Sequence, residues 1–411
     1  MRRVVVTGMG CVSPVGNDVA STWDALLAGR HGIGPITRFD ATDQKVELAA
    51  EVKGFDPSLY MEASDARKTD LYAQYAIAAA AQAMEDSRLA DSVDPYRFGV
   101  YIGSGIGGIS TSIRETEVLL NRGPGRISPF FVPMMIANMG SALVAIRHGA
   151  KGPNLPVVTA CSSGTNAIGE AYRAIVYGAA DAILAGGAEA SINPLAVGGF
   201  ANIMALNTTA DPDRASIPFD KGRSGFVIGE GAGVLVLEEL EHAQARSAPI
   251  YGEVIGYANT CDAFHMTAPK PDAEGSAAMI RLTFEDAGIP ADENLYINAH
   301  GTSTPLNDKI ETMAIKQALG DMAYRVAISS TKSMTGHMLG AAGGMEAIAA
   351  LKVLGAGRIP PTIGLTDPDP DCDLDYVPGV SREADVRTAL SISLGFGGHN
   401  AGVLFRRMEQ E

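Results

Sequence analysis

One of the four cysteines, Cys161, stands where a thiol can act as a nucleophile. It lies in the stretch VVTACSSGTNAIGEA (157–171), between an apolar run that predicts a buried strand and an Ala/Ile pattern at 167–171 that predicts a helix. A thiol at a helix N-terminus is expected to have a lowered pKa. The small residues at 162–164 leave room for a substrate carbonyl and for backbone N–H groups that bind an oxyanion. A single cysteine is more often a small buried apolar residue, so its position, rather than its type, carries the prediction.

Two of the seven histidines follow predicted strands in the second half of the chain. His300 lies in NAHGTSTPLND, directly after the strand-like run LYINA. His337 lies in SSTKSMTGHMLGAAGG, shortly after Lys332, where another strand gives way to a helix. A lone histidine after a strand is usually structural. Here two histidines stand at strand ends in the same half, and Cys161 stands at the equivalent edge of the other half. This favours a shared catalytic site.

Other motifs are weaker. VTGMGCVSPVG resembles a dinucleotide-binding glycine loop, but Pro14 falls where the helix should run, so a strand and a turn are predicted. GSGIGGIS (103–110) lacks the Lys-Ser/Thr pair of a phosphate-binding loop and predicts close backbone packing near a pocket. The cysteines are far apart and lack metal-ligand spacing, which predicts reduced thiols, no disulfide framework and no metal site.

The elements that position these residues occur twice along the chain. AMEDSRLADSVDPYRFGVYIGSG (83–105) pairs with TFEDAGIPADENLYINAHGT (283–302), and GEGAGVLVLEE (229–239) with GGHNAGVLFRR (397–407). The Cys161 segment matches the His337 segment in the same order, as strand, small-residue turn and Ala-rich helix. This ordered repetition predicts two equivalent halves, 1–250 and 251–411, the first carrying the cysteine and the second the histidines.

Within each half, short apolar strands alternate with helical segments. RFGVYIG, DAILAGGAE and GAGVLVLEE are bounded by glycine and predict strands buried on both faces, whereas DLYAQYAIAAAAQAMEDS and GMEAIAALKVLGAG predict helices. PDRASIPFDKGRSGFVIGEG predicts a long loop. The prediction is an α/β protein with mixed sheets between helices, in which the two halves share a central layer.

Composition limits the function classes. Hydrophobic residues make up 46% and charged residues 19%, as in a globular protein. The 32 basic and 47 acidic residues give a net charge of −15, which argues against nucleic acid or an anionic membrane as the main partner. No signal peptide and no apolar run of membrane-spanning length is evident, which predicts a soluble, cytoplasmic protein.

Four ordered motifs, TACSSGTNAIG, NAHGTSTPLND, SSTKSMTGHMLGAAG and SLGFGGHNA, closely resemble the β-ketoacyl-acyl-carrier-protein synthases of the elongating class, the synthase II type in particular. The resemblance covers essentially the whole chain. It implies a thiolase-like α/β fold, with two duplicated halves in a five-layered α-β-α-β-α sandwich and usually a homodimer. The implied reaction is a decarboxylative Claisen condensation in fatty acid elongation, an acyl transfer from and to acyl carrier protein, with no cofactor.

The resemblance also implies roles for the candidate catalytic residues. Cys161 would accept the acyl group, and the N–H groups of Cys161 and Phe396 would form the oxyanion hole. His300 and His337 would hold the malonyl thioester oxygen while carbon dioxide leaves. Lys332 would act electrostatically. The remaining implied positions are Glu346 behind the site, Thr302 and Thr304 on the phosphopantetheine arm, and Ile106, Phe200 and Phe396 at the acyl pocket and its gate.

Carrier-protein docking is implied for Arg67 and Lys68, with Arg122 and Arg126 as neighbouring candidates. A local basic patch would allow an acidic enzyme to bind an acidic carrier. The chain departs from the best-known relatives at His399, where they have Thr. We expect His399 to be structural, near the loop of Phe396.

Four other kinds of protein share parts of this pattern. A thiolase would need a second catalytic cysteine near the C-terminus, and a starter-type condensing enzyme would pair its cysteine with His and Asn. Neither pattern is present. A type II polyketide ketosynthase has the same Cys-His-His set and stays open. A non-catalytic chain-length partner subunit would lack the nucleophile, and Cys161 argues against it.

Overall fold

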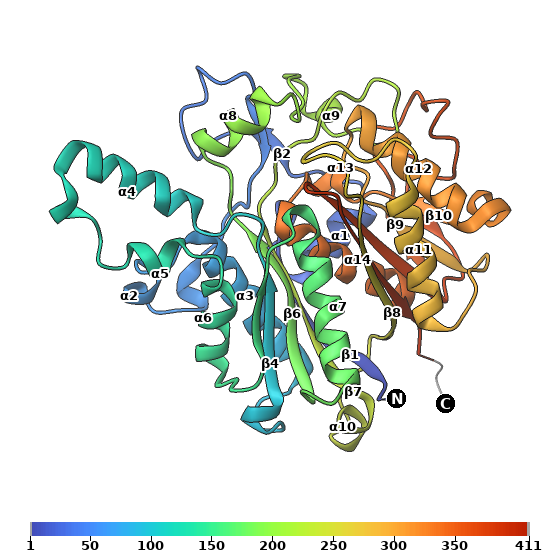
Figure 1. The fold of residues 1–411 in the computed structure, drawn as a ribbon, viewed down its shortest axis with the longest axis horizontal. Helices are drawn as coiled ribbons and strands as arrows, with labels where there is room; N and C mark the ends of the chain where they lie inside the picture. Colours follow the sequence, from blue (N-terminus) through green and yellow to red (C-terminus); the bar gives the residue numbers. More distant parts are fainter. Residues whose placement is uncertain (1, 409–411) are drawn as a thin grey trace.

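The computed structural model describes residues 2–408, in which ten strands form one mixed sheet in the order β10-β9-β13-β14-β8-β1-β7-β6-β4-β5 (Figure 1). The strands of this sheet are β1 (Val4–Val12), β4 (Phe98–Gly103), β5 (Asn154–Val157), β6 (Ala182–Glu189), β7 (Gly231–Glu239), β8 (Gly252–Cys261), β9 (Leu295–Asn298), β10 (Ala327–Ser329), β13 (Thr388–Gly395) and β14 (His399–Arg406). Two small hairpins are formed by β2 (Ile33–Pro35) with β3 (Leu48–Ala50) and by β11 (Arg358–Ile359) with β12 (Arg382–Glu383).

The sheet consists of two five-stranded parts with the same pairing pattern. In the first part, β1 and β6 each pair antiparallel with β7, and β4 pairs parallel with β6 and β5. In the second, β8 and β13 each pair antiparallel with β14, and β9 pairs parallel with β13 and β10. Among the described residues, the two parts of the sheet are joined where Val4–Val6 of β1 pairs antiparallel with β8. The internal repetition predicted from the sequence is therefore present in the strand topology.

Helices cover both faces of each part and create five layers. The helices are α1 (Val19–Leu27), α2 (Ala63–Ala66), α3 (Leu71–Ser87), α4 (Ile109–Arg122), α5 (Phe131–Met135), α6 (Met139–His148), α7 (Ser163–Val176), α8 (Pro194–Asn202), α9 (Pro212–Ala215), α10 (Leu240–Ala245), α11 (Glu274–Ala287), α12 (Pro305–Leu319), α13 (Lys332–Thr335) and α14 (Ala342–Ala356). Helices α3 and α6 pack outside the first part, and α11 and α12 outside the second. Helices α7 and α14 pack between the two parts, against strands of both. This arrangement confirms the predicted fold class.

The central helices approach each other at their N-termini, where the functional segments begin. A Cβ on Gly164 of α7 would lie 2.9 Å from the carbonyl oxygen of Gly340 and 2.9 Å from the nitrogen of Gly344. Only glycine permits this approach of two backbones. The hydroxyl groups of Thr165 and Ser393, 2.7 Å apart, add a polar link between α7 and β13. The segment of Cys161 is thereby held against the segment that follows His337.

Three local predictions need correction. The strand before Cys161 was expected to be buried, but β5 is an edge strand, exposed or half-buried along its length, and it ends at Val157. The predicted long loop contains the short helix α9, which Asp211 caps by accepting from the N–H of Asp213. The run Leu339–Ala356 has the length and apolar composition of a membrane span, contrary to expectation, yet 83% of it is buried in the central layer.

Candidate active site

A cavity of about 340 Å³ lies at the junction of the two halves. Its lining includes seven of the residues predicted from the sequence, namely Cys161, Phe200, His300, Thr302, Thr304, His337 and Phe396. Cys161 and Phe200 come from the first half, and the others come from the second. The duplicated fold thus brings the predicted nucleophile and both predicted histidines to one cavity wall.

Cys161 lies on a sharp turn that directly precedes α7. Ala160 has φ +51°, a left-handed conformation that non-glycine residues seldom adopt. Ser163 holds the turn closed, because its hydroxyl donates to the Ala160 carbonyl at 2.6 Å and accepts from the Thr159 N–H at 2.9 Å. A second residue with left-handed backbone, Leu339 with φ +47°, begins the equivalent turn before α14. Gly340 is therefore the counterpart of Cys161 in the duplicated fold.

Electrostatics at Cys161 differ from the prediction based on the helix N-terminus. Burial raises the pKa of the Cys161 thiol to about 12, while the charge of Lys332 and the N–H of Phe396 act in the opposite direction. The free enzyme therefore holds a protonated thiol at neutral pH. The sequence argument considered only the favourable end of the helix and did not include desolvation, which is the larger cause here.

His300 and His337 face each other, with ring centroids 5.1 Å apart and ring planes at 89°. Burial holds the pKa of both imidazoles well below the usual range, and the charge of Lys332 acts in the same direction. Both rings are therefore neutral at physiological pH. Each Nδ1 is buried without a hydrogen-bond partner, so a proton there would have no acceptor. This favours the tautomer with the proton on Nε2, where it can reach a ligand in the cavity.

The backbones of the two histidines are fixed by different elements. Glu311, on α12, accepts from the N–H of His300 at 2.6 Å and from the N–H of Gly301 at 2.7 Å. The backbone of His337 is held by the first half of the chain, because its N–H donates to the Val227 carbonyl at 2.7 Å. Burial raises the pKa of Glu311 to about 7. Glu311 was not identified from the sequence, because a separation of 11 residues from His300 gives no signal.

Lys332 lies behind the histidines and does not line the cavity. Its ammonium group forms an ion pair with Oε1 of Glu346, and both side chains are buried. Burial raises the pKa of Glu346, and the charge of Lys332 opposes that rise. The second oxygen of Glu346 has no hydrogen-bond partner. The Lys332 ammonium, held in place by Glu346, supplies a positive charge next to both imidazoles and the thiol.

A row of aromatic rings connects the predicted gate to the histidines. The ring centroids of Phe396 and Phe200 are 6.3 Å apart, those of Phe200 and Phe226 are 5.5 Å apart, and those of Phe226 and His337 are 5.2 Å apart. Phe226 also lines the cavity. The sequence analysis missed Phe226, since an isolated Phe in an expected loop does not differ from ordinary core.

The loop of Phe396 is the hairpin turn between β13 and β14. A Cβ on Gly395 would lie 3.3 Å from the Cys161 nitrogen and 2.8 Å from the Thr159 oxygen, so glycine allows the loop to lie directly beside the nucleophile. The Ser162 hydroxyl donates to the His399 carbonyl at 2.9 Å and ties the loop to the turn of Cys161. The backbone N–H groups of Phe396 and Cys161 both face the Cys161 sulfur, where two donors can bind an oxyanion.

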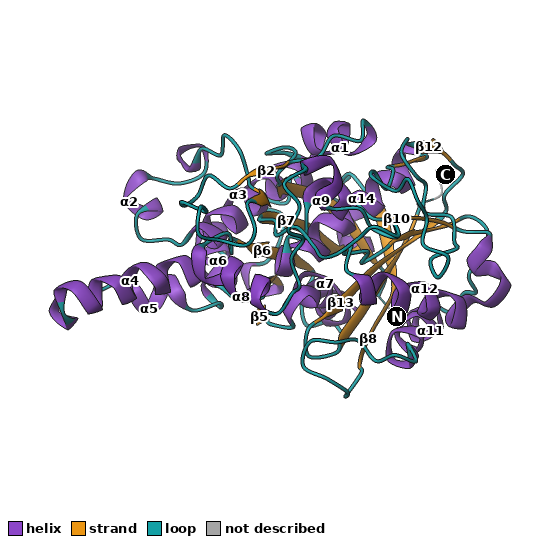
Figure 2. Cartoon of the chain, turned by 90° about the horizontal axis from the view of Figure 1, so that it is seen from above, coloured by secondary structure: helices purple, strands orange, loops and turns teal. Residues whose placement is uncertain are grey.

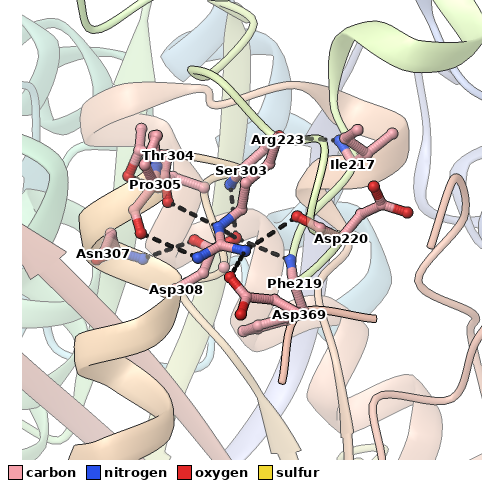
Figure 3. A network of polar contacts seen from close by, with 12 residues as sticks. Ile217, Phe219, Asp220, Arg223, Ser303, Thr304, Pro305, Asn307, Asp308 and Asp369 are labelled. Carbon is pink, nitrogen blue, oxygen red and sulfur yellow. Dashed lines mark hydrogen bonds and ion pairs between the residues drawn. The ribbon is translucent and has the colours of Figure 1, made fainter. Parts of the chain in front are cut away.

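Thr302 and Thr304 lie side by side in the cavity, with their hydroxyl oxygens 3.0 Å apart. Between them, Ser303 has φ +69°. Figure 3 shows the buried network that holds this strained loop. Asp308 accepts from the Ser303 N–H at 3.2 Å, and the guanidinium of Arg223 donates to the Thr304 carbonyl at 3.1 Å.

Arg223 is the centre of that network, and its side chain is only 3% exposed. It also donates to the carbonyls of Pro305 and Asp220, each at 2.9 Å, and to the carboxylate of Asp369 at 2.7 Å. One side chain from the first half therefore fixes the Thr302–Thr304 loop of the second half. The sequence analysis did not identify Arg223, because it lies inside a segment interpreted only as a loop.

The other predicted residues lie away from this cavity. Ile106 is 37% exposed and does not line it, although its backbone N–H donates to the buried carboxylate of Glu189 at 3.3 Å. Arg67 and Lys68 are exposed at the end of α2, with the ammonium of Lys68 5.2 Å from the ring centroid of Phe130.

Comparisons with known proteins agree with this geometry. The family described as "Beta-ketoacyl synthase, N-terminal domain" matches residues 1–243, and "Beta-ketoacyl synthase, C-terminal domain" matches residues 251–366. The 3-oxoacyl-[acyl-carrier-protein] synthase 2 of Synechocystis sp. is 52% identical and that of Coxiella burnetii 51%, each over 99% of both chains.

Solved ketosynthases have the same fold. A beta-ketoacyl synthase from Burkholderia phymatum superposes with a TM-score of 0.92 at 36% identity over 100% of both chains. The ishigamide ketosynthase/chain length factor gives a TM-score of 0.92 at 39% identity, covering 99% of this chain and 100% of that one. A type II polyketide ketosynthase in complex with its acyl-carrier protein gives 0.90 at 36% identity, with 99% and 100% coverage.

The chain belongs to the beta-ketoacyl synthase family, as an acyl-transferring condensing enzyme. The family and the class of enzyme predicted from the sequence motifs are thereby confirmed.

Proposed function

We propose that the protein is a β-ketoacyl-acyl-carrier-protein synthase that elongates fatty acyl chains by decarboxylative Claisen condensation of malonyl carrier protein. The observation that carries this proposal is one cavity that holds a thiol at a helix N-terminus and two neutral imidazoles from the opposite half. The full-length similarity to 3-oxoacyl-[acyl-carrier-protein] synthases 2 supports it.

In the first step, Cys161 takes the acyl group. Its sulfur attacks the thioester carbonyl of the acyl carrier, the new C–S bond forms, the old C–S bond breaks, and the carrier thiol leaves with the proton lost by Cys161. The N–H groups of Cys161 and Phe396 bind the oxyanion of the tetrahedral intermediate. Because burial raises the pKa of the free thiol, the thiolate forms during the attack and is not stored beforehand.

In the second step, malonyl carrier protein binds in the same cavity. His300 and His337 donate from Nε2 to the malonyl thioester oxygen, which becomes an enolate oxygen as the carboxylate leaves as carbon dioxide. The enolate carbon then attacks the acyl carbonyl on Cys161. A C–C bond forms, the C–S bond to Cys161 breaks, and the cysteine thiolate takes up a proton. Neutral imidazoles suit this role because they donate hydrogen bonds to the enolate oxygen without transferring a proton to it.

Other residues would position the substrates. The fixed charge of Lys332, paired with Glu346, keeps the histidines neutral and favours the thiolate. Thr302 and Thr304 would hydrogen-bond the phosphopantetheine arm. Phe200, Phe396 and Ile106 would shape and gate the acyl pocket, and Arg67 and Lys68 would bind the carrier.

We also propose a cytoplasmic homodimer of two-half subunits divided near residue 250. Helices α4 and α5 project from the body and carry Leu120 and Val132, which are 78% and 55% exposed (Figures 1 and 2). The edge strand β5 nearby exposes Leu155 by 45%. A second copy of the chain would cover these apolar side chains and pair the free edge.

A type II polyketide ketosynthase is the second candidate, because one of the solved neighbours is the ketosynthase of a type II polyketide system. The test is to supply malonyl carrier protein with acyl carriers of graded length and to identify the products by mass spectrometry. We expect a single two-carbon extension per turnover, with release of the β-ketoacyl carrier. Repeated extension without reduction of the β-keto group would favour the polyketide function, and no extension would overturn both.

A further inference from the structure

A fully buried carboxylate, that of Glu189, lies at the end of β6 beside the active site and has no role in the mechanism proposed above. Five neutral groups donate hydrogen bonds to it. They are the backbone N–H groups of Gly105 at 2.7 Å, Gly340 at 3.1 Å and Ile106 at 3.3 Å, and the hydroxyl groups of Ser191 at 3.1 Å and Ser104 at 3.2 Å.

The glycine-rich loop after β4 directs successive N–H groups at this carboxylate. Those of Gly105 and Ile106 reach it directly, and that of Gly107 donates to the Ser104 hydroxyl at 3.0 Å, which in turn donates to Glu189. Successive N–H groups of this kind form a concavity that binds an anion. Burial raises the pKa of Glu189, and these hydrogen bonds act in the opposite direction. The segment GSGIGGIS therefore surrounds a carboxylate of its own chain.

The same carboxylate joins the two halves next to the nucleophile. One oxygen, Oε2 of Glu189, accepts from Gly105 in the first half and from Gly340 in the second. A Cβ on Gly340 would lie 2.4 Å from the Gly105 nitrogen, and a Cβ on Gly105 would lie 3.5 Å from the carbonyl oxygen of Ala160. Ala160 directly precedes the nucleophile, and Gly340 follows His337 closely. Glu189 thus stands between the turn of the nucleophile and the segment of the second histidine.

Glu189 also brings a charge to the site. The charge of Lys332 lowers the pKa of the Cys161 thiol, whereas that of Glu189 raises it. The two imidazoles of the site are neutral and add no charge of their own. Removal of the carboxylate should therefore leave the ammonium group unopposed and make the thiol more reactive.

We propose that Glu189 is a positioning residue for the condensation reaction, which fixes the loop after β4 and the Gly340 turn relative to Cys161 and restrains the thiol electrostatically. The inference rests on the proposed function. The two contributions are separable by substitution. Glutamine keeps an oxygen for Gly105 and Gly340 while its amide faces the two serine hydroxyls, but it has no charge. Methionine has a similar length and neither the oxygen nor the charge.

The test measures two rates in E189Q and E189M. One is alkylation of the Cys161 peptide by iodoacetamide at about pH 8, followed by mass spectrometry. The other is single-turnover condensation of the acylated enzyme with malonyl carrier protein. Glu51 provides the matched control E51Q, because it is a buried carboxylate that accepts from the N–H groups of Thr37 at 2.7 Å and Arg38 at 3.0 Å and does not line the cavity.

Thiol reactivity should follow the charge, and condensation should follow the accepting oxygen. Both Glu189 variants should be alkylated about three- to tenfold faster than wild type, as expected when a nearby like charge is removed. Condensation should stay within about threefold of wild type in E189Q and fall at least about tenfold in E189M, because small displacements of reacting groups are costly. E51Q should change neither rate.

A further variant, S104A, keeps the charge but removes the hydroxyl that links Gly107 to the carboxylate. It should slow condensation without faster alkylation, and it replaces E189M if that variant does not fold. Unchanged alkylation in E189Q, or equal condensation in wild type, E189M and S104A, would overturn the role of Glu189 and leave the proposed function intact. A wild type that no acyl carrier can acylate would overturn the proposed function, whereas the alkylation rates would still report on the charge of Glu189.

Discussion

The imidazoles of His300 and His337 lie beside the Lys332 ammonium in a buried site, and both effects favour the uncharged ring. A histidine with an ordinary pKa of 6.5 would lose its neutral form as the pH falls through that value. Here the folded pKa lies well below that value, so the neutral donors persist to lower pH.

This predicts the pH dependence of the condensation step. Enzyme already acylated at Cys161 should condense with malonyl substrate at a nearly constant single-turnover rate from about pH 8 to about pH 6, since both rings stay neutral over this interval. Rapid-quench measurement of the β-ketoacyl product checks it. An inflection near pH 6.5 that disappears in H300N or H337N would show that an ordinary histidine pKa controls the step.

The same shift has a consequence for stability. In the unfolded chain these histidines take up protons as the pH falls below about 6.5, whereas in the folded protein they do not. The unfolded state therefore gains protons first, and the free energy of unfolding falls with decreasing pH through that region. Burial of Cys161 acts on stability at high pH. There the thiol of the unfolded chain loses its proton before the folded one, so the free energy of unfolding falls as the pH rises.

At the scale of elements, the loop of Thr302 and Thr304 depends on the Arg223 network in Figure 3. Replacing Arg223 with Met would leave the buried Asp308 without its cation and the Thr304 carbonyl without its donor. Loss of one partner from a buried ion pair costs about 3–5 kcal/mol. Arg223→Lys keeps the charge but cannot donate to three carbonyls at once, so it should mainly raise KM for pantetheine-bound substrates.

Urea unfolding and steady-state kinetics check this prediction. Arg214→Met is the matched control, because Arg214 pairs with Asp220 in the same network but its side chain is 37% exposed. That control should lose less than R223M, because the Asp220 carboxylate keeps the N–H groups of Gly222, Thr366 and Asp367 as donors. If R223M and R214M unfold at the same urea concentration, Arg223 does not hold the loop.

Local elements differ in how far the sequence could predict them. The buried strands β4, β6 and β7 and the helices α3 and α14 were predictable, since apolar runs and helical spacing report burial directly. The exposed edge strand β5 was not, because an apolar run does not reveal whether a strand lies inside its sheet or at the edge. Arg223 was missed because all but one of its partners named above lie 81 to 146 residues away in sequence.

At the scale of the whole molecule, the duplicated fold divides the site between two halves. The sequence motifs were sufficient to single out Cys161, His300 and His337 as candidates, and the packing of the two halves against each other explains why they share one cavity. The pKa of the thiol and the supporting Glu311 and Phe226 could not be predicted, because desolvation and long-range packing arise only when the halves meet.

The same division makes a prediction about the two chemical steps. In the proposed mechanism, acyl transfer uses Cys161 and the nearby N–H groups, whereas decarboxylation and condensation need the histidines of the second half. Variants of the histidines should therefore separate the steps, and variants of the cysteine should abolish both.

The most direct measurement is rapid-quench mass spectrometry of the enzyme mixed first with acyl carrier protein and then with malonyl carrier protein. Wild type should carry one acyl group, mapped to the Cys161 peptide, and should pass it into β-ketoacyl product. H300A and H337A should still acquire the acyl group but retain it, with condensation reduced at least about 100-fold, as for loss of a key transition-state donor. C161S should remain unacylated. An acyl group mapped to Cys11, Cys261 or Cys372, or histidine variants that condense at the wild-type rate, would contradict the account.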